Sequence, residues 1–337
     1  MRKIKIHFVC LGNAYRSRLA EAYAKSLNLK GFEFSSSGVA AHLFEQRKPY
    51  YADLLAKNHM LLRFLSATQV QTSSKLLDEQ DMIIFMHPDV LEQAKKEYQI
   101  NMFKVHCWNI DDLWQICLER KVSESDLDKT VKLAEETFQK IKRDVDRLAS
   151  QITKSSWVDV INSDNQDVGY AQSLDTANKK GLWHRSVHAM IRLPDGRYVV
   201  EKRSNKIIFA PGLLDITVGG SLDPGETPEQ AAIREIKEEI NVEIRPDQLK
   251  LLNITKGSHY RPKYNRYSRG FSYNYFVQLE PGQGLLKPQQ SEVAQLMLAT
   301  HPQAKKLVRN HRLKHFGRLN YAYKLYRDNL KLAEELA

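Results

Sequence analysis

Residues 219–242 of this 337-residue chain read GGSLDPGETPEQAAIREIKEEINV. Thr227 is a favourable N-cap, Pro228 suits the first helical position, and Gln230 falls where a capping-box partner belongs. We therefore expect a helix over about residues 228–240. The buried stripe of this helix consists of three isoleucines: Ile233, Ile236 and Ile240.

Three glutamates of the expected helix share one face because they stand at positions i, i+3 and i+4: Glu235, Glu238 and Glu239. Like charges this close repel one another. A divalent cation such as Mg²⁺ or Mn²⁺ relieves that repulsion and also binds the phosphates of a substrate. The spacing alone is equally typical of a solvated acidic face, but Gly220, Glu226 and Arg234 at their fixed distances favour a metal site.

The whole stretch resembles the signature of the Nudix hydrolases at every position except Asn241, which replaces a glycine. The resemblance implies a metal-dependent hydrolase of diphosphate linkages. The implied ligands are three carboxylates and one carbonyl: Glu235, Glu238, Glu239 and the backbone carbonyl of Gly220. Glu235 is also implied to be catalytic, Glu226 to be a supporting carboxylate, and Arg234 to orient the glutamates. Asn241 suits the left-handed geometry that a helix C′ position requires.

The preceding residues resemble the Nudix subgroup related to isopentenyl-diphosphate isomerase. The resemblance rests on Gly181-Leu182-Trp183-His184-Arg185, Arg203-Ser204, Lys206 and Pro211-Gly212. An isomerase of this kind needs a catalytic cysteine, and the three cysteines of the chain all lie in its first half. We therefore expect a hydrolase, with Arg203 as a candidate substrate-binding residue.

The beginning of the chain carries a second motif. A β-type run, Ile4 to Val9, is followed by CLGNAYRS at residues 10–17 and then by the helical pattern RLAEAYAKSL. A strand, a tight loop and a helix N-terminus together present backbone N–H groups to an anion. A cysteine at such a loop favours the thiolate, and an arginine beside it binds phosphate oxygens. The motif predicts thiolate attack on phosphorus by Cys10, with Arg16 as the phosphate clamp.

This loop resembles that of the low-molecular-weight protein tyrosine phosphatases, as do Ser35-Ser36-Ser37-Gly38 and DEQDMIIFMHPDVLEQ. The resemblance implies that Cys10 is the nucleophile and Arg16 the phosphate clamp, without a cofactor. It implies that Asn13 braces the loop, that Ser17 donates a hydrogen bond to the thiolate, and that Asp112 is the general acid. Asp111 is the alternative acid if the register differs by one residue.

Three departures from the phosphatase pattern bear on substrate range and activity: Tyr15, Arg18 and Leu113. They leave open an inactive phosphatase fold kept as a scaffold or phosphate-binding module. A thiol-linked arsenate reductase is a further alternative, although Cys107 and Cys117 flank the acid rather than precede it.

Composition and charge fit a chain of two domains. Hydrophobic residues make up 42%, there is no long apolar run or signal peptide, and the cysteines suit a reducing compartment, so we expect a cytoplasmic protein without a membrane segment. Helical periodicity over 127–152 closes a first domain, residues 1–152. Residues 153–156 form a linker, and a strand at 157–162 opens a second domain, residues 157–337.

The net charge of +11 is concentrated near the end of the chain, where the last 87 residues hold 15 basic and 5 acidic side chains. Within HYRPKYNRYSRGFSYNYF, tyrosines alternate with basic residues, and Arg261, Lys263 and Arg266 are candidate substrate-binding residues. Single-stranded nucleic acid and a plain β-hairpin are the alternatives. Glu292 is either an extra metal ligand or a surface glutamate.

We therefore expect an α/β chain in which a flavodoxin-like doubly wound parallel sheet precedes a Nudix α/β/α sandwich. The expected function is a bifunctional hydrolase. One half performs Mg²⁺-dependent hydrolysis of a nucleotide-type diphosphate, and the other performs cysteine-dependent phosphomonoester hydrolysis. The partners expected are a phosphorylated small molecule, a nucleotide diphosphate or a phosphotyrosine protein. The alternative is a Nudix hydrolase whose first domain is inactive and serves phosphate sensing or partner binding.

Overall fold

The computed structural model describes residues 2–44, 50–123, 126–207, 211–215, 218–283, 286–289, 291–309 and 319–336. The chain divides into two compact units. The first unit comprises Met1–Ser156 and Gly169–Ser173, and the second comprises Trp157–Val168 and Leu174–Ala337. Residues 169–173 thus pack with the first unit, although the sequence-based boundary places them in the second domain.

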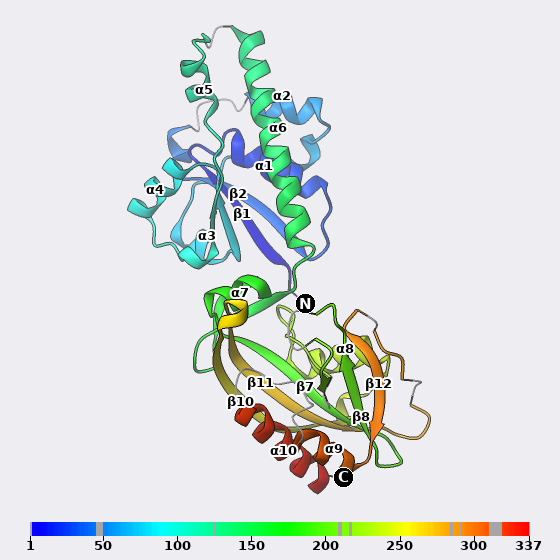
Figure 1. Ribbon diagram of the computed structural model, residues 1–337. Helices are drawn as coiled ribbons and strands as arrows, with labels where there is room; N and C mark the ends of the chain where they lie inside the picture. The colour runs from blue at the N-terminus through cyan, green and yellow to red at the C-terminus, as the bar shows by residue number, and fades with distance from the viewer. Residues whose placement is uncertain are drawn as a thin grey trace. The chain divides into compact units, whose positions relative to one another are not determined.

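The first unit is built on a four-stranded parallel sheet of order β2-β1-β3-β4 (Figure 1). Its strands are β1 (Ile4–Cys10), β2 (Phe32–Gly38), β3 (Met82–Phe85) and β4 (Val105–Cys107). Its helices are α1 (Arg16–Ser26), α2 (Tyr50–Asn58), α3 (Ser74–Asp78), α4 (Pro88–Glu97), α5 (Leu113–Glu119) and α6 (Leu127–Ile152), with 3-10 turns η1 (Ala41–Leu43), η2 (Leu62–Phe64) and η3 (Met102–Lys104). The 127–152 helix expected from periodicity is confirmed as α6.

Helices cover both faces of this sheet, as the buried pattern of its strands requires. On one face, apolar side chains of β1 and β3 pack with those of α3 and α4: Val9, Ile83, Phe85, Leu77, Val90 and Leu91. On the other face, α1 packs against β2 and β1, and α6 packs against α1. The doubly wound arrangement places the loop after β1 at the carboxyl edge of the sheet, where such folds bind their ligands.

The second unit is built on a mixed six-stranded sheet of order β10-β11-β7-β8-β12, with β9 paired to β8 (Figure 1). Its strands are β7 (His184–Arg192), β8 (Tyr198–Arg203), β9 (Leu214–Asp215), β10 (Leu249–Arg261), β11 (Arg266–Gln278) and β12 (Val293–Ala299). β11 runs parallel to β7, and the other pairs are antiparallel. A smaller pair consists of β5 (Trp157–Ile161) and β6 (Asp167–Ser173).

Helices also cover both faces of the larger sheet. Its remaining elements are α7 (Leu174–Lys180), α8 (Pro228–Ile240), α9 (His301–Arg309), α10 (Leu319–Glu335) and the 3-10 turns η4 (Pro246–Gln248) and η5 (Pro262–Tyr264). One core cluster joins α8 to the sheet through Ile236, Ile240, Val187, Ala189 and Val277. The other joins α9 and α10 to the opposite face through Ala304, Leu330, Met190 and Phe276. The result is the expected α/β/α sandwich.

The ends of α8 follow the sequence signals closely. Thr227 and Gln230 form a reciprocal capping box, and Pro228 occupies the first turn. Asn241 closes the helix with φ 57° and ψ 37°, the left-handed conformation expected for it. The helix therefore has a fixed start and stop, which fixes the direction in which its glutamates project. Throughout the described ranges, no helix has the length and apolar character needed to cross a membrane.

Candidate active sites

The first site is the loop between β1 and α1, which surrounds the buried thiol of Cys10. The Cys10 Sγ lies 3.0 Å from Ser17 Oγ, and the backbone N–H of Asn13 donates to the same sulfur at 3.2 Å. Both groups can stabilise negative charge on sulfur. The structure therefore places Ser17 where the sequence assigns a donor to the thiolate.

Asn13 holds the loop in shape from inside. Its Nδ2 donates to Ser17 Oγ and to Ser36 Oγ, each at 2.9 Å, and its Oδ1 accepts from the Val70 N–H at 2.7 Å. The residue has a φ of 48°, which asparagine tolerates better than most residues. Close packing adds a second constraint, because a Cβ at Gly38 would lie 2.5 Å from the Asn13 backbone nitrogen. The loop is thus fixed by the neighbouring strand β2 and by the segment before α3.

Arg16 and Asp112 meet directly at this loop. Arg16 is buried at the start of α1 and donates through Nη1 to the Ile110 carbonyl at 2.8 Å. Its Nη2 donates to Asp112 Oδ2 at 2.7 Å, while Asp112 also caps α5 and keeps its side chain 45% exposed. Asp111 instead lies 3.6 Å from His87 Nε2. The geometry therefore brings Asp112, rather than Asp111, to the arginine.

The three residues that depart from the phosphatase pattern, Tyr15, Arg18 and Leu113, each contact other parts of the first unit. The Tyr15 hydroxyl donates to the Ala134 carbonyl of α6 at 2.5 Å, while burial raises its pKa above the usual range. Arg18 is buried, and its Nη2 donates to the Ser66 carbonyl. Leu113 packs in the interior as the first residue of α5. Tyr15 therefore attaches the loop to α6, a contact that the sequence does not reveal.

A buried histidine lies on β1 behind the loop. The ring nitrogens of His7 lie 2.6 Å from Ser35 Oγ and 2.8 Å from Ser37 Oγ. Ser37 also accepts through its carbonyl from Ser17 Oγ at 3.3 Å. Burial lowers the pKa of His7 to about 3, so the ring is neutral at physiological pH. Sequence reasoning missed this residue, whose signal is a polar side chain within an apolar strand.

The second site lies on α8 and is organised by Arg234. Its guanidinium donates to both oxygens of Glu226 at 2.9 Å, to Glu235 Oε1 at 2.8 Å and to Glu238 Oε2 at 3.2 Å. It also donates to the Ser221 carbonyl at 3.1 Å, which joins the helix to the loop before it. Arg234 thus contacts the supporting carboxylate and two of the three expected ligands.

Two of the glutamates are buried beside the glycines that begin the motif. Burial raises the pKa of Glu235 to about 7, against the opposing charge of Arg234. Glu239 accepts from the Gly219 N–H at 3.1 Å, and burial together with the charge of Glu201 raises its pKa well above the usual range. A Cβ at Gly220 would lie 2.3 Å from Glu235 Oε1, so a larger residue there would displace that carboxylate.

Glu201 is a buried carboxylate that sequence reasoning missed. It lies on β8, where Arg203 Nη1 donates to its Oε1 at 3.3 Å. Its detectable signal is an acidic residue in the otherwise apolar run YVVE at residues 198–201. Glu292 is exposed, yet its charge also raises the pKa values of Glu235 and Glu239.

The donor set of this site fits a hard divalent cation. Buried carboxylates that raise one another's pKa are relieved when a cation replaces their protons. The Gly220 carbonyl accepts from the Val187 N–H at 2.8 Å, and a carbonyl oxygen has a second lone pair for a ligand. In the described part of the chain, no group of three or more acidic, histidine or cysteine residues is already gathered at metal-binding distances. The site therefore has suitable ligands, but contacts with Arg234 hold them and they do not converge on a single metal position.

The expected substrate-binding residues are distributed differently. Arg203 lies on β8 beside Glu201, within the second site. Arg261 is buried at the end of β10, and Lys263 lies in the following turn over the ring of Tyr264. Arg266 begins β11 and forms an ion pair with Asp175. The last three residues thus gather at the turn of the β10–β11 hairpin, where Lys263 contacts Tyr264 and Arg266 contacts Asp175.

The two sites thus combine a cysteine-arginine loop in one unit with a carboxylate cluster in the other. Residues 5–158 match the family model of the low molecular weight phosphotyrosine protein phosphatases, and residues 182–318 match that of the NUDIX domain. The chain is therefore a fusion of a low-molecular-weight-phosphatase-like domain with a Nudix domain. Both domains belong to hydrolase families.

Two relatives agree with the assignment of the Nudix domain. An uncharacterized Nudix hydrolase of Rhodococcus erythropolis, orf19, is 42% identical over 79 residues, which are 23% of this chain and 42% of that protein. A Nudix hydrolase of Deinococcus radiodurans is 37% identical over 89 residues, which are 26% of this chain and 50% of that protein. The chain thus spans about half the length of the curated relatives it matches. A solved low molecular weight protein tyrosine phosphatase from Bacillus subtilis is 21% identical, with a TM-score of 0.36, and covers 45% of this chain and 98% of its own.

Proposed function

We propose that this protein is a bifunctional hydrolase, with a metal-dependent diphosphate hydrolase in the second unit and a cysteine-dependent phosphomonoesterase in the first. The observation that carries the proposal for the second unit is the buried pair Glu235 and Glu239 beside Gly219 and Gly220. Buried carboxylates of like charge are costly unless a cation or a proton compensates them. A site of this kind fits Mg²⁺ or Mn²⁺ and a diphosphate bound to it.

In the second unit, Glu235, Glu238, Glu239 and the Gly220 carbonyl would hold the cation. A bound divalent cation polarises phosphoryl oxygens and lowers the pKa of water. Arg234 orients Glu235 and Glu238, because it donates to both. Glu235 is the residue we assign to proton removal from the attacking water, because it is a buried carboxylate beside Gly220.

In the first unit, the Cys10 thiolate attacks the phosphorus of a phosphomonoester. An S–P bond forms and the ester P–O bond breaks while Asp112 donates a proton to the leaving oxygen. Arg16 then binds the phosphoryl oxygens, and Ser17 stabilises the thiolate when it leaves. Water deprotonated by Asp112 attacks the phosphocysteine, which releases phosphate and restores the thiolate. The contact of Arg16 with Asp112 supports this pairing of clamp and acid.

The second candidate is a Nudix hydrolase whose first domain only senses phosphate or binds a partner. The engagement of Arg16 by both Asp112 and the Ile110 carbonyl favours this candidate, because the guanidinium that would clamp a phosphate already has two partners. A phosphate must displace Asp112 from the guanidinium before the loop can act. The two candidates share the second site and differ only in turnover at Cys10.

Two assays test the proposal. The first measures p-nitrophenyl phosphate hydrolysis in EDTA by the wild type and by Cys10→Ser, with Cys107→Ser as control because Cys107 is exposed. Turnover that Cys10→Ser abolishes and Cys107→Ser keeps supports the phosphomonoesterase. If the wild type shows no turnover, the second candidate, a first domain that only senses phosphate or binds a partner, is supported instead.

The second assay measures hydrolysis of a panel of nucleotide diphosphates with Mg²⁺. Glu239→Gln removes a buried carboxylate, and the control Glu243→Gln removes an exposed one that pairs with Lys237. We expect Glu239→Gln to lose the metal-dependent activity and Glu243→Gln to keep it. Activity that survives Glu239→Gln and removal of the metal would contradict the proposed role of α8.

A further inference from the structure

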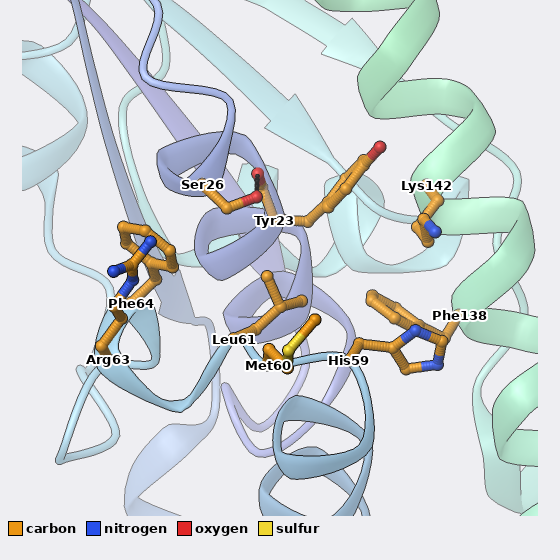
Figure 2. A pocket seen from close by; sticks show the side chains of 9 residues that line it. All are labelled: Tyr23, Ser26, His59, Met60, Leu61, Arg63, Phe64, Phe138 and Lys142. Atoms are coloured by element: carbon orange, nitrogen blue, oxygen red, sulfur yellow. Dashed lines mark hydrogen bonds between the residues drawn. The ribbon is translucent and has the colours of Figure 1, made fainter.

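The first unit contains a pocket of about 490 Å³ that is separate from the Cys10 loop. It lies between α1, the end of α2, η2 and α6, and Figure 2 shows the nine side chains that line it. None of the residues that we assign to catalysis is among them. A pocket of this volume is in the range that holds small organic ligands.

Aromatic and apolar side chains form the walls of the pocket. Tyr23 comes from α1, Phe64 from η2 and Phe138 from α6. Met60 is 86% exposed and has a φ of 57°, a conformation that is unfavourable for a bulky residue. Exposed apolar groups around a concavity favour a ligand with an apolar or aromatic body.

The walls are held in place by hydrogen bonds outside the pocket. The Tyr23 hydroxyl donates to Asp146 Oδ1 at 2.8 Å. His59 Nε2 lies 2.9 Å from Glu135 Oε1, and its ring meets Phe138 edge-on at 4.8 Å. The carboxylates of Asp146 and Glu135 are therefore engaged, and neither residue lines the pocket.

Two cations border the pocket from opposite ends (Figure 2). Arg63 lies over the ring of Phe64 at 4.6 Å, and Lys142 lies over the ring of Tyr23 at 5.3 Å. Within the ranges that the structure describes, neither cation lies at ion-pair distance from a carboxylate, although the charge of Lys142 acts on Glu135. A cation held beside aromatic rings at the edge of a pocket is suited to an anionic group on a ligand that enters the pocket.

We propose that this pocket binds a small ligand that combines an aromatic or heteroaromatic ring with a phosphate-like anion, of the kind a nucleoside monophosphate presents. The ring stacks on Tyr23, Phe64 or Phe138, and the anion contacts Lys142 or Arg63. The ligand contacts both α1, which begins at Arg16, and α6, to which Tyr15 is hydrogen-bonded. The inference depends on neither proposed activity, because it uses no residue of either active site.

Photolabelling of the full chain with 8-azidoadenosine 5′-monophosphate tests the proposal at the level of the site. Labelled peptides are mapped by mass spectrometry, so that binding elsewhere on the chain is recognised by its position. We expect label on peptides of α1, η2 or α6, displaced by AMP. Adenosine lacks the anion and ribose 5-phosphate lacks the ring, so each should compete about tenfold less well than AMP.

Charge variants complete the test. Lys142→Ala or Arg63→Ala, whichever removes the cation that contacts the anion, should reduce pocket labelling about tenfold, the effect of losing one charge-assisted contact. Lys140→Ala is the matched control, because Lys140 is an exposed lysine of the same helix that does not line the pocket. No label in these peptides, or label that both pocket variants leave unchanged, overturns the proposal. Competition by adenosine equal to that by AMP overturns the role of the anion.

Discussion

Acidification should destabilise the first unit through His7. The ring is neutral and buried, with one nitrogen near Ser35 Oγ and the other near Ser37 Oγ. A neutral imidazole offers one donor and one acceptor, which two hydroxyl groups can satisfy. Protonation would place an uncompensated charge inside the sheet, and burial accordingly lowers the pKa of His7 to about 3.

The sign of the effect follows from proton binding. Between pH 3 and pH 6.5 the unfolded chain holds a proton on His7 that the folded chain does not hold, because 6.5 is the ordinary pKa of histidine. The free energy of unfolding therefore rises with pH in this window, by about 1.4 kcal/mol per pH unit. A change from pH 7 to pH 5 should cost the first unit about 2 kcal/mol at His7 alone.

Native-state hydrogen exchange measures this loss in the full chain. Protection of peptides that span β1, corrected for intrinsic exchange, is compared at pH 7 and pH 5 in the wild type, His7→Gln and His42→Gln. His42 is the control because it is exposed. We expect the protection of the wild type and His42→Gln to fall by about 2 kcal/mol more than that of His7→Gln. Equal losses in all three proteins would refute the reasoning.

Three further predictions concern backbone positions. Gly38→Ala places a Cβ 2.5 Å from the Asn13 backbone nitrogen, so phosphomonoester hydrolysis should fall more than about tenfold while diphosphate hydrolysis is kept; equal loss of both in parallel assays would contradict this. Gly220→Ala places a Cβ 2.3 Å from Glu235 Oε1. It should raise the Mg²⁺ concentration that gives half-maximal diphosphate hydrolysis by about tenfold or more, and an unchanged metal titration would contradict this. Asn241→Gly should stabilise α8 by up to about 1 kcal/mol, because the position has a φ of 57°, and thermal unfolding that shifts downward would contradict it.

Local sequence signals predicted the elements whose determinants are local. The capping box at Thr227 and Gln230 and the left-handed Asn241 lie within the helix they delimit, and the structure reproduces them. The 26-residue amphipathic pattern of α6 is likewise contained in its own segment. The same is true of the strand before Cys10, which ends where the motif begins.

Contacts between distant segments were not predictable from these patterns. Glu201 approaches Glu239 only because β8 lies beside the face that α8 covers. For this contact, no local feature of the sequence distinguishes Glu201 from any other glutamate in a strand. The pairing of Arg16 with Asp112 depends on where α5 begins relative to α1. Residues 169–173 pack with the first unit through tertiary contacts, such as the hydrogen bond from the Ala171 N–H to Asp81 Oδ1, which periodicity does not encode.

The Cys10 loop also sets an order for folding during synthesis. Its side chains find partners far along the chain, since Asn13 bonds to a residue 57 positions later, Arg16 to one 96 later and Tyr15 to one 119 later. Contacts between residues so far apart in sequence form slowly, because the entropy cost of closing a long loop comes before the contact can stabilise it. A ribosome must therefore release α6 before the loop can acquire its final shape, yet none of these partners comes from beyond residue 134. The phosphatase-like site can thus mature while the Nudix domain is still being translated.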